Sequence, residues 1–209
     1  MPYGFMDIAL TPSVRAVQQA MGSDRLWTDF KGKRSSDRFT EHEAAFIAER
    51  DSFYMASVSE TGWPYVQHRG GPPGFVRMLD DRTLAFADYR GNRQYISTGN
   101  IAADPRVCLF MMDYANRSRL KIYARAEIVA LDADRELTVL FTDTAYRARL
   151  ERLFRLRLEA FDWNCPQHIN PRYSGAQVAD AVASLQERIA GLEAENAELR
   201  ARLGEVGAS

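Results

Sequence analysis

The stretch Phe86-Ala87-Asp88-Tyr89-Arg90-Gly91-Asn92-Arg93-Gln94-Tyr95-Ile96-Ser97-Thr98-Gly99-Asn100 begins as a strand, passes through a polar loop and continues as a short helix. The apolar run 83–87 predicts the strand, and residues 95–102 predict the helix. Glycine lets a backbone approach a ligand closely, and arginine binds phosphate through paired N–H donors. Because the loop combines a glycine with two arginines, it indicates a site for a phosphorylated small molecule of nucleotide-like type.

Other cationic and amide side chains could reach the same anion. Arg93 and Asn92 lie where the helix would begin, and the N–H groups of a first helical turn attract anions. Arg69 lies in a run rich in glycine and proline, on a neighbouring strand. Arg119 and Lys121 alternate along a later strand, so we expect both side chains on one face. The alternative for each cation is a solvent-exposed position on a surface turn or strand.

The surrounding sequence predicts short antiparallel strands joined by tight turns. Runs of strand-forming residues occupy 52–58, 64–68, 74–79, 83–87, 106–112 and 119–130. Strands at this close spacing favour a closed antiparallel barrel over β-α-β units. A helix over 41–50 precedes them, with Thr40 as its N-cap and Glu43 at the capping-box position.

The flanking segments complete the predicted organisation. Residues 132–160, in which leucines lie among arginines and glutamates, are expected to be helical, and an irregular segment follows over 161–172. The chain then divides into three predicted parts: an N-terminal arm with one helix (1–40), a barrel domain (41–175) and a C-terminal coiled-coil helix (176–209).

The C-terminal part carries apolar residues in alternating steps of four and three. These residues form the a and d positions of a heptad repeat: Val178, Val182, Leu185, Ile189, Leu192, Leu199, Leu203 and Val206. Asn196 is the polar member, at an a position, where a buried Asn favours a parallel two-stranded register. The pattern predicts a parallel homodimeric coiled coil, and the alternative is a lone amphipathic helix that folds back on the domain.

Composition narrows the classes of function. The chain has 209 residues, a formal net charge of -1 and a pI near 6.3, so nothing indicates a nucleic-acid or membrane-surface partner. Two cysteines, Cys108 and Cys165, fit a reducing compartment better than a disulfide framework. The three histidines lack the spacing of metal ligands, and no signal peptide or membrane-spanning run is recognisable. We therefore expect a soluble cytoplasmic protein without a metal site.

Residues 52–129 resemble the FMN-binding split-barrel family of the pyridoxamine 5′-phosphate oxidase-like proteins. The resemblance depends on the loop and helix 86–100 quoted above and on Asp104-Pro105-Arg106-Val107, which is similar to the start of the family's next strand. The segment Phe161-Asp162-Trp163-Asn164-Cys165-Pro166-Gln167-His168 resembles the tail of an uncharacterised subgroup. The resemblance implies a mainly β fold, a split antiparallel barrel with flanking helices.

The resemblance also implies a homodimer that binds FMN non-covalently between its subunits. Carried over by position, the cofactor-binding residues are His68, Arg69, Phe86, Ala87, Asp88, Asn92, Arg93, Gln94, Arg119, Lys121 and Trp163. Asn92, Arg93 and Gln94 match the phosphate-binding positions. Arg119, with Lys121, falls where the opposite subunit reaches the flavin ring, and Trp163 either stacks on a ring or packs structurally.

The sequence departs from the family pattern at three points, so we do not expect the reaction of true pyridoxamine phosphate oxidases. Gln94 replaces a lysine that the family often has after the arginine, the region 143–150 lacks the substrate motif of true pyridoxamine phosphate oxidases, and their C-terminal Arg-Leu-His element is absent. The expected function is an FMN-dependent oxidoreductase for an unknown small molecule, with NAD(P)H as a candidate electron donor. The alternatives are a non-catalytic flavin-binding or sensing module whose coiled coil docks a partner, and a barrel for haem or a deazaflavin.

Overall fold

The computed structural model describes residues 4–28, 36–142, 146–163 and 166–206. It divides the chain into two compact units, Met1–Asp113 with Arg117–His168, and Tyr114–Asn116 with Ile169–Ser209. Cys165, the second cysteine, and residues 143–145 of the region compared with the substrate motif lie outside the described residues.

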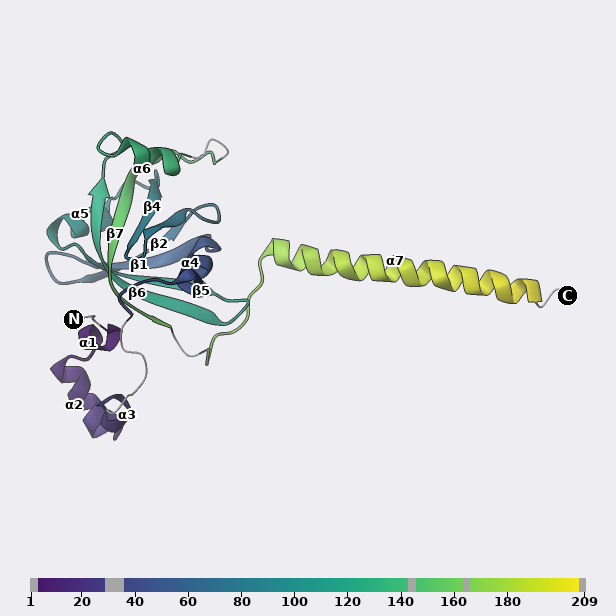
Figure 1. Ribbon diagram of the computed structural model, residues 1–209, viewed down its shortest axis with the longest axis horizontal. Helices are drawn as coiled ribbons and strands as arrows, with labels where there is room; N and C mark the ends of the chain where they lie inside the picture. The colour runs from purple at the N-terminus through teal and green to yellow at the C-terminus, as the bar shows by residue number, and fades with distance from the viewer. Residues whose placement is uncertain (1–3, 29–35, 143–145, 164–165, 207–209) are drawn as a thin grey trace. The chain divides into compact units, whose positions relative to one another are not determined.

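The first unit is built on one antiparallel sheet of seven strands in the order β2-β1-β5-β6-β7-β4-β3 (Figure 1). The strands are β1 (Ser52–Val58), β2 (Pro64–Gly70), β3 (Val76–Asp80), β4 (Thr83–Tyr89), β5 (Arg106–Asp113), β6 (Ser118–Val129) and β7 (Leu150–Trp163). The sheet curls around a common core and leaves β2 and β3 as its two edges, as in a split barrel. The predicted fold class, a split antiparallel barrel with flanking helices and a long C-terminal helix, is confirmed.

Apolar and polar side chains alternate along the strands, and the apolar ones form the barrel core. On β6, Leu120 and Ile122 are buried, while Arg119 and Lys121, which alternate with them, are partly exposed. The centre of the core is aromatic: the rings of Phe86 and Phe154 stack with centroids 4.9 Å apart, and Phe53 meets Phe86 edge-on at 5.1 Å. A smaller apolar cluster on the other side of β4 and β7 includes Ala85, Ala87, Val129, Leu137, Phe141 and Leu153.

The helix α4 (Glu41–Ala48) begins as predicted. The side chain of Glu43 accepts a hydrogen bond from the backbone N–H of Thr40 at 2.8 Å, which forms the expected capping box. The described residues of the N-terminal arm form three short helices, α1 (Phe5–Ala9), α2 (Pro12–Ala20) and α3 (Asp24–Thr28), where the sequence predicted one. In α1, the ring of Phe5 stacks on Tyr123 of β6 at 4.6 Å.

The prediction that residues 132–160 are helical is wrong. Among the described residues of this range, only α6 (Arg135–Leu140) is a helix, and residues 150–163 form β7, which pairs with both β4 and β6. Leucine and arginine have high helix propensity, but the buried residues recur at every second position, as in Phe154, Leu156 and Leu158. This period of two places one face of β7 in the core, and burial outweighs propensity. The strand also includes residues 161–163, which the sequence had suggested were irregular.

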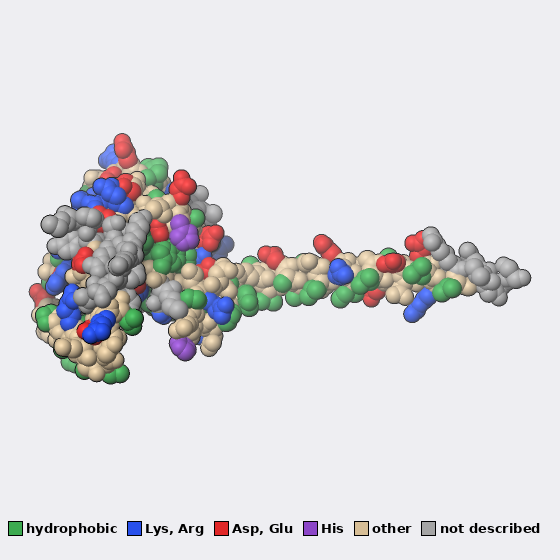
Figure 2. Space-filling model, turned by 60° about the horizontal axis from the view of Figure 1, so that its bottom comes forward, with side chains coloured by type: hydrophobic (Ala, Val, Ile, Leu, Met, Phe, Trp, Pro, Cys, Tyr) green, Lys and Arg blue, Asp and Glu red, His purple; other side chains and the backbone are tan. Residues whose placement is uncertain are grey.

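The second unit consists mainly of α7 (Gly175–Val206), a continuous helix of 32 residues. Figure 2 shows hydrophobic side chains gathered along one side of α7, with charged side chains on other sides. Among the described helices, none has both the length and the apolar character that a membrane span requires. The long helix was predicted, whereas its pairing with a second copy stays a prediction.

Candidate functional site

The loop between β4 and α5 (Ile96–Ala103) has a tight backbone held by its own side chains. The backbone N–H of Gln94 donates to Asn92 Oδ1 at 3.1 Å, and Asn92 Nδ2 donates to Gln94 Oε1 at 3.0 Å. Arg93 and Tyr95 have φ values of 64° and 54°, in the left-handed region that non-glycine residues adopt at a cost. The Arg93 side chain is exposed and makes no ion pair with any described residue. The loop therefore leaves one cation available to an anion.

Helix α5 begins without a side-chain cap. Its N-cap residue is Tyr95, whose side chain accepts no hydrogen bond from the first turn. The polar residues on the buried side of α5 are occupied: the Ser97 hydroxyl donates to Gln67 Oε1 at 2.8 Å, and Asn100 Nδ2 donates to Ser57 Oγ at 3.0 Å. These hydrogen bonds fix the helix onto β1 and β2, so Gln67, Ser97 and Asn100 have a structural role.

A buried ionic cluster connects three strands at this end of the barrel. Asp88 on β4 forms an ion pair with Arg69 on β2, and its Oδ2 lies 3.3 Å from Nε of Arg152 on β7. The exposed fractions of these side chains are 7% for Asp88, 12% for Arg69 and 19% for Arg152. One carboxylate is therefore shared by two arginines that are largely out of water.

The cluster continues to the start of α5. The guanidinium of Arg152 lies over the ring of Tyr95, 4.6 Å from its centroid, and also pairs with Glu151 at 3.0 Å. Glu151 accepts a hydrogen bond from the Tyr95 hydroxyl at 3.1 Å and lies 3.6 Å from Arg90 Nε. Counted together, three guanidinium groups face two carboxylates, so the cluster carries an excess of one positive charge.

Two of the arginines keep a buried donor without an acceptor. Within the described part of the chain, Nε of Arg69 and Nε of Arg152 are buried and have no hydrogen-bond partner. The Nε of Arg152 is within ion-pair distance of Asp88 but is not aligned for a hydrogen bond. Unsatisfied buried donors are rare in proteins, and a charged N–H group is the kind that phosphate oxygens accept. The residues present therefore fit an anionic ligand.

Burial of these charged groups disfavours their charged forms, so the cluster does not stabilise the fold strongly. Burial raises the pKa of the Asp88 carboxyl above its ordinary value, although Arg69 and Arg152 oppose this shift. Burial also lowers the pKa of the Arg69 guanidinium, against the attraction of Asp88. A buried ion pair seldom stabilises a protein more than apolar residues of the same size would. Groups perturbed in this way are concentrated at functional sites.

The structure places the other predicted residues in two further groups. His68 and Arg69, adjacent in sequence, project from opposite faces of β2, because side chains alternate along a strand. His68 lies on the outer face of the sheet, with its ring 5.6 Å from Tyr54 of β1. Arg119 and Lys121 share that outer face, as expected, although β6 is a central strand and not the last one.

The two outer-face cations differ in their surroundings. Lys121 pairs with Asp162 at 2.7 Å and lies over the ring of Phe5, so it secures the N-terminal arm. Arg119 lies over the ring of Phe110 at 5.7 Å, and its buried Nε has no partner among the described residues. Of the two, Arg119 retains a donor for a ligand.

Three predicted residues are packed in the protein. Phe86 is fully buried in the main core and Ala87 is 4% exposed in the smaller cluster, so neither side chain is available to a ligand. The indole Nε1 of Trp163 donates to Glu43 at 2.7 Å, and its ring meets Phe46 edge-on at 4.8 Å. Trp163 therefore holds the end of β7 against α4.

The outer face of the sheet is apolar and exposed. The side chains of Tyr54 and Val58 on β1 are 42% and 41% exposed, and that of Val66 on β2 is 61% exposed. The register pairs Tyr54 with His68 and with Phe110, so these residues lie on the same face as Arg119. We call this surface, Tyr54, Val58, Val66 and Phe110, the outer apolar face.

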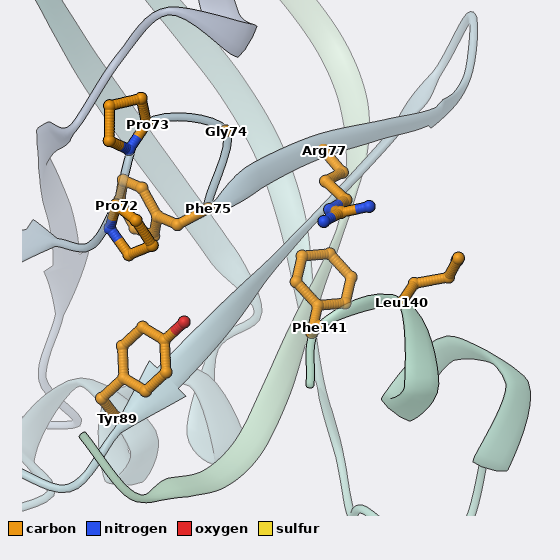
Figure 3. Close-up of a pocket in the computed structure, with 8 residues that line it drawn as sticks. All are labelled: Pro72, Pro73, Gly74, Phe75, Arg77, Tyr89, Leu140 and Phe141. Atoms are coloured by element: carbon orange, nitrogen blue, oxygen red, sulfur yellow. The ribbon is translucent and has the colours of Figure 1, made fainter. Parts of the chain in front are cut away.

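The glycine- and proline-rich segment after β2 lines a small pocket instead of joining the ionic cluster (Figure 3). Its walls are Pro72, Pro73, Gly74, Phe75, Arg77, Tyr89, Leu140 and Phe141, and the guanidinium of Arg77 lies over the Phe141 ring at 5.5 Å. A Cβ at Gly71 would lie 2.6 Å from the Phe75 ring, and Gly74 has a φ of 79°. These two glycines are therefore explained by the turn that buries Phe75.

Sequence reasoning missed Arg152 and Glu151, which complete the cluster. Both lie on β7, in the segment predicted to be helical. The signal that could have identified the strand is the alternation of apolar and charged residues from 154 to 160. Extended backwards by the same period of two, it places Glu151 on the charged face and Arg152 on the face of Phe154 and Leu156.

Comparison with known proteins agrees with this fold. A sequence model described as pyridoxamine 5′-phosphate oxidase matches residues 39–161, more than half of the chain. No curated protein sequence matches the chain.

Several solved structures are similar. A putative pyridoxamine 5′-phosphate oxidase from Lactobacillus delbrueckii has 22% identity, covers 60% of this chain and 94% of its own, and has a TM-score of 0.46. An FMN-binding protein from Syntrophomonas wolfei has 14% identity with coverage of 73% and 95% and a TM-score of 0.41. The haem storage protein HutZ from Vibrio cholerae has 17% identity with coverage of 60% and 94% and a TM-score of 0.40.

Proposed function

Because this chain belongs to the pyridoxamine 5′-phosphate oxidase family, we propose that it binds FMN, with the phosphate held by the arginines around the β4–α5 loop. The observation that carries the proposal is the pair of buried guanidinium groups, Arg69 and Arg152, whose Nε atoms have no hydrogen-bond partner within the described chain. Arg93 adds an exposed cation on the loop, and the uncapped first turn of α5 adds backbone donors.

The residues of the loop have distinct roles in this proposal. Arg93 binds the anion directly, because its side chain is exposed and not held by any described carboxylate. Arg69 and Arg152 supply positive potential from the buried cluster. The dielectric constant is low there, so their charges act strongly on a nearby anion. Asp88 holds the two guanidinium groups in place. Its negative charge offsets part of their positive charge, so it lowers the affinity of the site for an anion. Gln94, where the family often has lysine, contributes an amide that is already bonded to Asn92.

We further propose that a second copy of the chain completes the site. The outer apolar face is of the kind that a partner covers, since contiguous exposed apolar surface is uncommon on monomers. His68 and Arg119 lie on that face, opposite to the side from which Arg69 projects. Both groups can therefore serve one ligand only if the outer face of one copy meets the loop region of another.

Bound FMN would supply two-electron chemistry at its ring, and we propose an oxidoreductase that acts on a small molecule with NAD(P)H as a candidate donor. The protein's part is to anchor the phosphate, to orient the ring and to shield the site from water. A non-catalytic flavin-binding module is the second candidate. Turnover of NAD(P)H by the flavin-loaded protein separates the two.

The first test is the visible spectrum of protein purified without added cofactor, repeated after FMN addition and desalting. We expect the wild type to retain oxidised flavin bands and Arg93→Ala to retain much less. Arg157→Ala is the matched control, because Arg157 is an exposed arginine opposite Thr83, at the other end of β4 from Asp88. A colourless wild-type protein that does not hold FMN contradicts the proposal, and haem bands in its place would assign the barrel to that ligand.

A further inference from the structure

Within its own unit, the helix α7 presents an apolar seam that no described residue covers. The seam side chains are all exposed, at 50% for Val178, 43% for Val182, 61% for Leu185, 55% for Ile189, 50% for Leu192, 50% for Leu199 and 72% for Leu203. We propose that this seam pairs with α7 of a second copy of the chain, in a parallel and in-register two-stranded coiled coil. The proposal depends on the tail alone and holds whether or not the barrel binds flavin.

The apolar seam of the helix favours a partner. In proteins, helices gain most of their stability from packing of an apolar face and less from intrinsic propensity. The 32 residues of α7 include four consecutive heptads whose a and d positions follow one another without interruption. This repeat has a period of 3.5 residues, which keeps the seam turned toward a single partner helix along its whole length.

The residue types in the seam favour a coiled coil of two helices. The a positions hold Val182, Ile189, Asn196 and Leu203, and the d positions hold Val178, Leu185, Leu192, Leu199 and Val206. In the middle of the seam, β-branched residues therefore occupy a and leucines occupy d. In parallel coiled coils, β-branched residues at a together with leucine at d favour dimers over trimers and tetramers.

Asn196 specifies the orientation. It occupies an a position, where its amide is buried on pairing and has to find a polar partner. In a parallel, in-register pair, the two Asn196 side chains face each other and can exchange a hydrogen bond. In an antiparallel pair, or after a shift by one heptad, each Asn196 faces apolar side chains.

The flanking charges specify the register and fit a second copy. Arg188 at a g position faces Glu193 at an e position of the partner, and Glu195 faces Arg200 in the same way. Within one helix these pairs are five residues apart and do not face each other, so the complementarity has a use only between helices. A shift by one heptad would oppose Arg188 with Arg200 and Glu195 with Glu193. Both like-charge contacts disfavour that register.

Parallel pairing has a consequence for the barrels. Each barrel is joined to the N-terminal end of its own α7, so parallel helices place both attachment points together. An antiparallel pair would separate them by about 48 Å, the length of 32 residues at 1.5 Å each. The tail thus raises the effective concentration of one barrel for the other.

Disulfide cross-linking of the full chain tests the proposal. In a Cys108→Ser, Cys165→Ser background, Leu199→Cys places a thiol in the seam and keeps Asn196, and Ala194→Cys places one at the outward-facing f position as control. Under mild oxidation we expect most of the Leu199→Cys protein to migrate as a covalent dimer on a non-reducing gel, and Ala194→Cys to remain mostly monomeric.

Two outcomes would overturn the pairing. Equal cross-linking at both positions would mean that the tails are merely tethered near each other. Absence of the Leu199→Cys dimer would mean that α7 binds another surface or another orientation of itself. The charge pattern gives a second measurement: Arg188→Glu should lower the yield of the cross-link, and adding Glu193→Arg should restore it. Failure of that rescue contradicts the in-register arrangement. The flavin spectrum of the same variants reports separately on the barrel.

Discussion

Asp88 and Arg152 face each other across β4 and β7, with Oδ2 of Asp88 3.3 Å from Nε of Arg152, while the same carboxylate also pairs with Arg69. The strand register brings this carboxylate and this guanidinium together, since residues directly opposite on neighbouring strands have their side chains on one face. Together with Glu151, Asp88 thus partly neutralises the three arginines of the site.

Replacing Asp88 with asparagine should destabilise the protein and strengthen its binding of anions. Removing one partner of a buried ion pair leaves uncompensated charge, so we expect a loss of about 3 kcal/mol in the free energy of unfolding, measured with urea. With Arg69 released, inorganic phosphate should bind roughly tenfold more tightly, the equivalent of one charge-assisted hydrogen bond. Isothermal calorimetry of wild type and Asp88→Asn measures the second effect.

The control is Asp162→Asn, which removes a carboxylate from a more exposed pair with Lys121. That pair should contribute less than about 1 kcal/mol. If Asp88→Asn were as mild as the control and left phosphate affinity unchanged, the buried cluster would have neither of the roles assigned to it.

Asp104 should titrate with a pKa of about 2. Hydrogen bonds from the Arg106 guanidinium and backbone N–H lower the pKa of this carboxyl from 3.8, and they fasten the start of β5. Because the folded-state pKa is depressed, the stabilisation is present above pH 3.8 and is lost as the pH falls through 2. The carboxyl chemical shift in an NMR titration measures the midpoint. Arg106→Ala should return it to the ordinary range of aspartate, and a midpoint unaffected by that change would contradict the assignment.

Trp163 should prove structural and not a ligand-stacking residue. Hydrogen bonds from Thr40 and Trp163 lower the pKa of Glu43 although burial opposes the shift, and Trp163→Phe removes one of these bonds. We expect a loss of about 1.5 kcal/mol in unfolding free energy with FMN retention unchanged. Trp63→Phe, at a 73% exposed position in the β1–β2 turn, is the control and should change stability by less than about 0.5 kcal/mol. Loss of flavin at full stability would reverse the assignment of Trp163.

The barrel could be predicted because its first six strands show local signals. Each has apolar or β-branched residues bounded by turn residues, and the capping box at Thr40 marks the start of α4. Strand β7 could not be predicted from propensity, because leucine, arginine and glutamate all favour helices. Its pairing on both sides with β4 and β6 is a long-range effect, and tertiary burial decides such segments.

The candidate site could be predicted only in part, for the same reason. Arg69, Asp88 and Arg93 lie in segments whose polar character is visible in the sequence. That Asp88 neutralises Arg69 depends on the approach of β2 to β4 across the barrel, which no local pattern encodes. Nor could the sequence show that Asn92 and Gln94 bond to each other, or which of the neighbours His68 and Arg69 points to the outer face of the sheet.

The last prediction concerns the two glycines of the loop region. It tests whether a glycine is present there because a ligand approaches the backbone closely or because the fold has no room for a side chain. A Cβ at Gly91 or at Gly99 would meet no atom within 4 Å, and neither residue has a positive φ, so the fold itself tolerates a side chain at both positions. Gly99 lies inside α5, where alanine should stabilise the helix by about 0.5–1 kcal/mol. Gly91 lies beside Asn92 and Arg93. If the backbone there approaches a phosphate, Gly91→Val should fold normally and retain much less FMN than Gly99→Ala after desalting. Equal retention by the two variants would show that Gly91 is dispensable and that side chains alone hold the anion.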